Sequence, residues 1–140
     1  MSERTDSWAK GGMRLSGAIR IGAMMHEQGF GLGIEMNPDG TVKATCALGA
    51  AKTAMGYNHG EMANEFGLYD YVWHPIRQQP MTRGQVIADL NDGYRWTRNQ
   101  IADWVEQEEN KEIERHERAV KEEREFQDRI AREQRERSSQ

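Results

Sequence analysis

The sequence has little cysteine and no long apolar run, and both absences narrow the class of protein. Cys46 is the single cysteine among 140 residues, so the chain cannot form an internal disulfide or a cysteine-rich zinc site. No stretch approaches the ~18 to 20 consecutive apolar residues that cross a bilayer, and residues 1–10 contain no apolar signal core. We therefore expect a cytoplasmic protein that has no membrane partner.

Glycine, proline and tryptophan are missing from the last quarter of the chain, where charged residues dominate. All 14 glycines, all three prolines and all four tryptophans precede residue 106. Residues 106–140 hold 21 charged residues, 12 acidic and nine basic, and only six apolar ones, which is too few to bury a core. We expect a flexible N-terminus over residues 1–12, a small globular domain over 13–105 and a highly charged helical tail over 106–140.

Apolar periodicity and turn residues indicate the fold of the domain. Apolar residues at helical spacing predict a helix over 13–28 that ends with Gly29 as its C-cap. The turn Asn37-Pro38-Asp39-Gly40, between segments 31–36 and 41–45, predicts a β-hairpin. We expect a mainly α (small α+β) fold with four to five helices, one short β-hairpin and a long charged C-terminal helix, with shorter helices over 47–55, 61–66 and 83–91.

Two helix starts carry the capping-box pattern, in which a threonine stands three residues before a glutamine. Thr82 precedes Gln85 in this way, and Thr97 precedes Gln100. The second start meets no stop signal, so we expect its helix to continue to about residue 136. Acidic residues stand four positions before basic ones there, the favourable orientation for helical ion pairs, at Glu114/Arg118, Glu117/Lys121, Glu125/Arg129, Asp128/Arg132 and Glu133/Arg137.

Four apolar residues of the tail, Ile113, Val120, Phe126 and Ile130, form a thin stripe. Ile113 and Val120 are one heptad apart, but Phe126 and Ile130 leave that register, so the pattern of a stable two-stranded coiled coil is missing. We expect at most weak homo-oligomer formation through this helix. The stripe is either part of a partner-binding surface or belongs to a solvated extension with no function.

An aromatic run follows the second short helix. Tyr69, Tyr71 and Trp73 alternate with other residues, which is the period of a strand. Aromatic residues and arginine dominate interface hot spots, so we predict that these three bind a partner, with His74 and Arg77 at the rim. The alternative is a strand whose aromatic face covers the domain core, and the alternation alone favours that alternative slightly.

No combination of residues predicts catalysis, a metal site or a cofactor. The four histidines are dispersed and form no zinc motif. Cys46 precedes a predicted helix, which could activate a thiol, but its small apolar surroundings favour a buried structural cysteine. The glycines at 29, 31 and 33 leave a helix instead of opening one, unlike phosphate-binding loops. We expect a protein that is not an enzyme.

Nucleic-acid binding has one candidate in the sequence. The helices predicted over 83–91 and from 98 onward would form a helix-turn-helix with Arg95 and Arg98 near a DNA backbone. Acidic residues follow along the second of these helices, and the sequence pI is about 5.6, so phosphates would be repelled. We therefore expect no nucleic-acid partner and keep this function as the third alternative.

Short motifs resemble a protein family. Cys46-Ala47-Leu48-Gly49-Ala50, then Leu90-Asn91-Asp92, then the segment from Thr97 to Trp104 look like small uncharacterised proteins of bacteria and their tailed phages. The similarity covers roughly residues 14–106 and excludes the charged tail and the aromatic run. The resemblance implies a phage or mobile-element accessory gene and carries no activity with it.

These observations lead to a functional hypothesis. We expect a non-enzymatic interaction factor, encoded by a phage or mobile element, that binds and modulates a host or defence protein in the host cytoplasm. Its partner would be a host or phage protein. The alternative from a different class is a virion component whose tail helix packs into an assembly.

Overall fold

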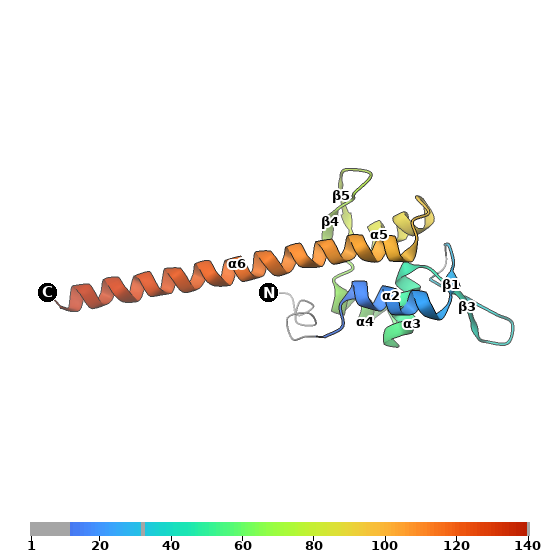
Figure 1. Ribbon diagram of the computed structural model, residues 1–140, viewed down its shortest axis with the longest axis horizontal. Coiled ribbons are helices and arrows are strands. Elements are labelled where there is room, and N and C mark those ends of the chain that lie inside the picture. The colour runs from blue at the N-terminus through green and yellow to red at the C-terminus, as the bar shows by residue number, and fades with distance from the viewer. Residues whose placement is uncertain (1–11, 32, 140) are drawn as a thin grey trace. The chain divides into compact units, whose positions relative to one another are not determined.

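The computed structural model describes residues 12–31 and 33–139 (Figure 1). This part of the chain contains five α-helices and two small β-sheets, and the predicted mainly α fold with a small β part is confirmed. The prediction for residues 1–12 lies outside the described residues except at its last position. The elements are α2 (Leu15–Met25), β1 (Glu27–Gln28), β2 (Ile34–Met36), β3 (Val42–Thr45), α3 (Ala47–Met55), α4 (His59–Phe66), β4 (Tyr71–Trp73), β5 (Pro80–Thr82), α5 (Arg83–Asp92) and α6 (Arg98–Ser138).

A single apolar core joins the helices of the domain. Helices α2, α3, α4 and α5 and the first turns of α6 all contribute buried side chains to it. Hydrophobic burial of this kind is the main favourable contribution to folding. Its largest members, each at most 7 % exposed, are Leu15, Ile19, Met62, Phe66, Leu68, Val86, Ile87, Leu90, Ile101 and Val105.

Helix α3 is enclosed on two sides so tightly that glycine is required at both contacts. A Cβ atom at Gly22 of α2 would overlap with the carbonyl group of Ala50 in α3. A Cβ atom at Gly49 of α3 would overlap with the carbonyl group of Gly33, which precedes β2. Because packed interiors tolerate little added volume, these two glycines allow close backbone approach between elements.

The first sheet confirms the predicted hairpin and corrects the predicted end of the first helix. β2 and β3 pair antiparallel across the turn at 37–40, and β1 pairs parallel with β3 on its other side. The predicted helix over 13–28 is wrong at its end, because α2 stops at Met25 and the chain becomes extended at His26. Gly29 is therefore not a C-cap, and its N–H donates to the Thr45 carbonyl at 2.9 Å. Backbone pairing with β3 replaces the last helical turn.

Side-chain caps fix the starts of the remaining helices. The Cys46 thiol accepts the Gly49 N–H at the start of α3. Asn58 and Glu61 form a capping box, so α4 begins two residues earlier than predicted. The capping boxes that begin with Thr82 and Thr97 are both confirmed, because each threonine accepts the N–H of the glutamine that returns a hydrogen bond.

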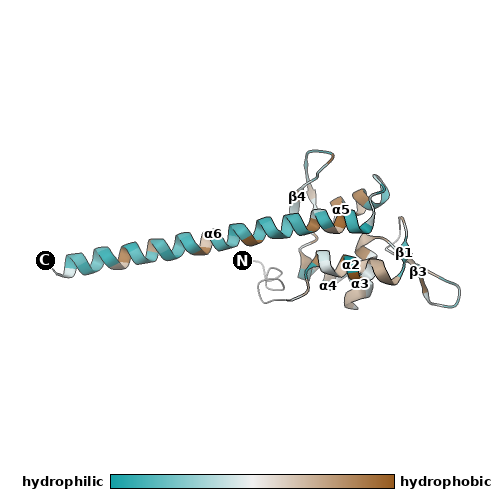
Figure 2. Cartoon of the chain, viewed as in Figure 1, coloured by the Kyte–Doolittle hydropathy of each residue, from teal (hydrophilic) through white to brown (hydrophobic). Residues whose placement is uncertain are grey.

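The chain divides into two compact units, Met1–Glu106 and Gln107–Gln140. The second unit is the later part of α6, a helix of 41 residues that is hydrophilic over most of its length (Figure 2). Among the described residues of α6, none of the five predicted ion pairs closes to within 4.0 Å, whereas Glu108 and Lys111 lie 3.2 Å apart. Exposed charges gain little from pairing, which explains the open geometry. No described helix combines the length and apolar character of a membrane span.

Candidate interaction surface

A second hairpin, which the sequence did not predict, carries the aromatic run. β4 and β5 pair antiparallel as a two-stranded sheet, with Val72 opposite Met81 and Trp73 opposite Pro80. Val72 and Met81 are partly buried against the core. Side chains alternate between the two faces of a strand, so Tyr71 and Trp73 lie on the face that points away from the core.

The three aromatic residues of the run are exposed to solvent. Tyr69, Tyr71 and Trp73 are 68 %, 74 % and 54 % exposed. The interpretation of this run as a cover for the core is therefore wrong, because Val72 alone of the strand β4 packs inward. We name Tyr69, Tyr71 and Trp73 the aromatic ribbon. Large aromatic side chains left exposed together are unusual on a soluble domain and mark interaction sites.

Local contacts hold two members of the aromatic ribbon in place. The Tyr69 hydroxyl lies 3.3 Å from His59 Nε2, and the two rings meet edge to face at 6.3 Å. The Trp73 indole N–H donates to Gln78 Oε1 at 3.2 Å. The Gln78 amide in turn donates to the Pro75 carbonyl at 2.9 Å. These contacts favour one orientation of each ring, which would reduce the entropy that binding costs.

His74 does not lie at the rim of this surface, so that part of the prediction is wrong. Its side chain is fully buried. Its Nδ1 atom accepts the N–H groups of Ile76 and Arg77, each at 3.0 Å. The ring hydrogen therefore sits on Nε2, which donates to Asp89 Oδ2 at 2.8 Å. His74 fastens the loop between β4 and β5 to helix α5 and so positions the aromatic ribbon from beneath.

Arg77, in the loop between β4 and β5, completes this anchor and keeps a half-exposed side chain. Its Nε atom donates to Asp89 Oδ2 at 2.8 Å and its Nη2 atom to Oδ1 at 3.3 Å. The hydrogen bond from Arg77 is the main cause that lowers the pKa of the Asp89 carboxyl; burial opposes it, and the hydrogen bond from His74 lowers the pKa further. The Arg77 side chain is 48 % exposed, and its place at the rim of a binding surface stays a prediction.

The apolar residues of the tail belong to the second unit and are described separately. Val120 and Phe126 are 43 % and 46 % exposed, and Ile113 and Ile130 are half-buried. The Arg129 guanidinium lies 5.4 Å from the centre of the Phe126 ring. Their assignment to a partner-binding surface stays a prediction.

The predicted thiol site at Cys46 and the predicted DNA-binding arginines Arg95 and Arg98 are explained by contacts within the domain. Cys46 is buried, and burial is the main cause that raises the pKa of its thiol, which disfavours the reactive thiolate. Arg98 is 8 % exposed and donates to backbone carbonyls, so it does not project from the surface as a DNA-backbone contact would. Arg95 stacks on the Phe30 ring at 4.1 Å. The described residues contain no group of three or more potential metal ligands.

Comparisons with known proteins assign no family. No family model, no curated protein and no solved structure matches this chain. The resemblance to small bacterial and phage proteins therefore stays a prediction, and any functional argument depends on the surface itself.

Proposed function

We propose that this protein is a non-enzymatic interaction factor that holds a partner protein on the aromatic ribbon. The observation that carries the proposal is the exposure of Tyr71 and Trp73 on a hairpin that His74, Arg77 and Asp89 fix to α5, with Tyr69 exposed in the turn before β4. Tyrosine, tryptophan and arginine are the residues most enriched at interface hot spots. The ribbon and Arg77, which follows it in the same hairpin, supply all three residue types as exposed or half-exposed side chains.

The backbone of the hairpin supports the same proposal. β4 and β5 form a sheet of two strands, so each has one edge without a strand partner among the described residues. Pro80 lacks an N–H, which makes β5 the poorer edge for a further strand. An extended segment of a partner that pairs with β4 would lie across Tyr71 and Trp73.

The choice of partner rests on the predicted resemblance to small bacterial and phage proteins. We propose a bacterial host protein, bound by an accessory factor of a phage or mobile element in the host cytoplasm. The test uses the tagged full-length chain to capture proteins from a bacterial lysate, followed by an affinity measurement on the purified partner by calorimetry.

The decisive variant replaces Tyr69, Tyr71 and Trp73 together by serine. Their exposure predicts a folded protein whose stability changes little. Hot-spot truncations cost ~2 kcal/mol or more each, so affinity should fall by at least about 30-fold. Met36→Ser is the matched control, because Met36 is also exposed, at 52 %, but lies on β2. Capture that survives the triple substitution in a folded protein would refute the proposal.

A further inference from the structure

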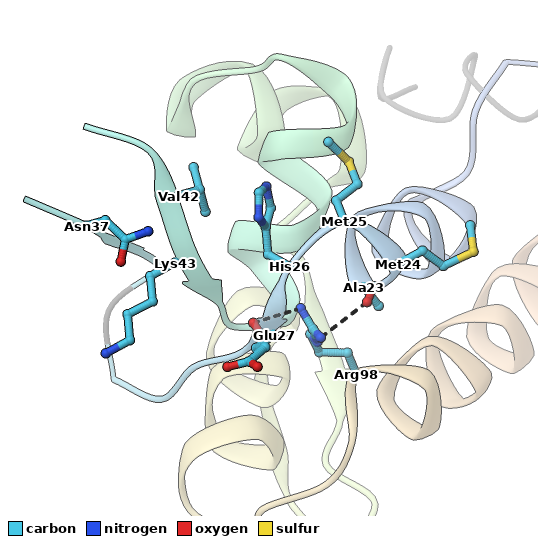
Figure 3. Close-up of a pocket in the computed structure, with 9 residues that line it drawn as sticks. All are labelled: Ala23, Met24, Met25, His26, Glu27, Asn37, Val42, Lys43 and Arg98. Carbon is cyan, nitrogen blue, oxygen red and sulfur yellow. Dashed lines mark hydrogen bonds between the residues drawn. The ribbon is translucent and has the colours of Figure 1, made fainter. Parts of the chain in front are cut away.

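A pocket opens between the C-terminal end of α2 and the first hairpin, separate from the aromatic ribbon. It has a volume of about 660 Å³ and is open to solvent on one side. Figure 3 shows the Arg98 guanidinium bonded to Ala23 and Glu27 at the end of α2, with Asn37, Val42 and Lys43 contributed by the hairpin. The lining therefore combines the buried Arg98 with apolar residues and with two further charged residues, Glu27 and Lys43.

Arg98 enters this pocket as a buried charge without a carboxylate partner. The residue is 8 % exposed. Its Nη1 atom donates to the Thr45 hydroxyl at 2.8 Å and to the carbonyls of Thr45 and Glu27 at 3.4 and 3.3 Å, and Nη2 donates to the Ala23 carbonyl at 3.3 Å. All of these acceptors are neutral, and no described carboxylate lies within 4.0 Å of the guanidinium.

Arg20 of the same domain has the carboxylate partners that Arg98 lacks among the described residues. Arg20 donates to Asp103 and Glu106 at 2.7 and 2.6 Å, although it is far more exposed. Buried charges in proteins are normally paired, because removing a charge from water is costly. Burial is also the main cause that lowers the pKa of Arg98. Its guanidinium has five N–H groups, and the observed bonds use three, so two remain for a ligand.

We propose that this pocket binds a monocarboxylate, with the Arg98 guanidinium as its anchor. A carboxylate has two acceptor oxygens for the two remaining N–H groups. The side chains of Met24 and Met25, 81 % and 51 % exposed, supply apolar contacts for the rest of the ligand. The carboxylate belongs either to a small organic acid or to an acidic side chain beside apolar residues in a protein.

The charges around the pocket favour a monocarboxylate over phosphate. A phosphate dianion needs more than one cation, and Lys43 is engaged with Glu35 at 3.5 Å. The Glu27 carboxylate belongs to the same pocket lining and would repel a second negative charge. Arg98 and Lys43 against Glu27 give the lining one net positive charge, which a singly charged ligand balances.

The experiment follows the Nε–H resonance of Arg98 by NMR in the full-length protein. We expect millimolar hexanoate to shift this signal in a saturable manner, and hexanol, which lacks the charge, to leave it unchanged. Inorganic phosphate should act more weakly than hexanoate. Arg83 is the internal control, because it is 5 % exposed and donates to two carbonyls, those of Phe66 and Gly67, outside the pocket. A capped Leu-Glu-Leu peptide that binds more tightly than hexanoate would identify a protein segment as the source.

Variants of Met24 test the pocket without touching the Arg98 bonds. Met24→Glu should weaken hexanoate binding by about two- to fivefold and Met24→Lys should strengthen it to a similar extent, as expected for a charge at an exposed position. Serine variants of the aromatic ribbon should bind hexanoate as the unmodified protein does, so failure here and failure of the proposed function are distinct results. An Arg98 signal that does not move, or that moves together with Arg83, would overturn the proposal.

Discussion

Replacing Asn91 by alanine removes the side chain that joins α5 to the loop after β1 and to the start of α3. Asn91 is fully buried. Its Oδ1 atom accepts from the Ala47 N–H at 3.1 Å and from Gln28 Nε2 at 3.2 Å. Its Nδ2 atom donates to the Gly29 carbonyl at 3.0 Å and to Asp92 Oδ1 at 2.8 Å. All four hydrogen-bonding positions of the amide are used.

The expected loss follows from the groups that the substitution leaves behind. The Ala47 N–H lies in the first turn of α3, where no intrahelical acceptor exists, and the Gly29 carbonyl is in a buried residue. Each buried group without a partner costs ~1 to 3 kcal/mol, while alanine recovers up to ~0.7 kcal/mol of helix propensity. We expect Asn91→Ala to lower the free energy of unfolding by ~2 to 5 kcal/mol.

Urea denaturation followed by tryptophan fluorescence measures this loss, since all four tryptophans precede the tail. Asn99→Ala is the control, because Asn99 is exposed in the first turn of α6 and should change stability by less than ~0.7 kcal/mol. A loss below ~1 kcal/mol for Asn91→Ala, within the range of one ordinary hydrogen bond, would refute the account of Asn91 as the link among these segments.

Two further substitutions test the close contacts of α3 and the anchor of the aromatic ribbon. Gly49→Ala should lower the free energy of unfolding by ~1 to 3 kcal/mol, because its Cβ would overlap with the Gly33 carbonyl. Gly60→Ala is the control: the nearest atom to its Cβ lies at 3.4 Å, so the same urea assay should show no change or a gain of up to ~1 kcal/mol. Equal effects of the two substitutions would refute the close contact at Gly49. The lowered pKa of Asp89 means that its carboxylate stabilises the fold above the unfolded pKa of ~3.9 and loses this contribution as the pH falls through the folded pKa. The difference in unfolding free energy between the unmodified protein and Asp89→Asn should therefore shrink between pH 7 and about pH 3, and a constant difference would contradict this assignment.

The local signals in the sequence predicted the elements that depend on local chemistry. Capping boxes at Thr82 and Thr97 mark two helix starts correctly, because a cap involves residues three positions apart. The turn at 37–40 likewise defines the first hairpin. The apolar surroundings of Cys46 correctly indicate a buried thiol.

The features that the sequence did not predict depend on contacts between residues that lie far apart in the chain. β1 forms because it pairs parallel with β3, and no pattern within residues 26–29 predicts this pairing. Arg98, the first residue of α6, is buried by carbonyls some 53 to 75 positions away. His74 was assigned to the surface because its place beside the aromatic run says nothing of Asp89, which lies 15 residues later.

The sequence by itself determined the helix caps, the first turn and the charged tail, since each follows from neighbours along the chain. It also has three aromatic residues at alternate positions. Such alternation indicates a strand with two different faces, but it does not show which face is buried. Only the tertiary structure decided that Val72 and Met81 pack against the core and that the face of Tyr71 and Trp73 is exposed. The physical reason is that burial depends on which surface the folded domain brings to the hairpin.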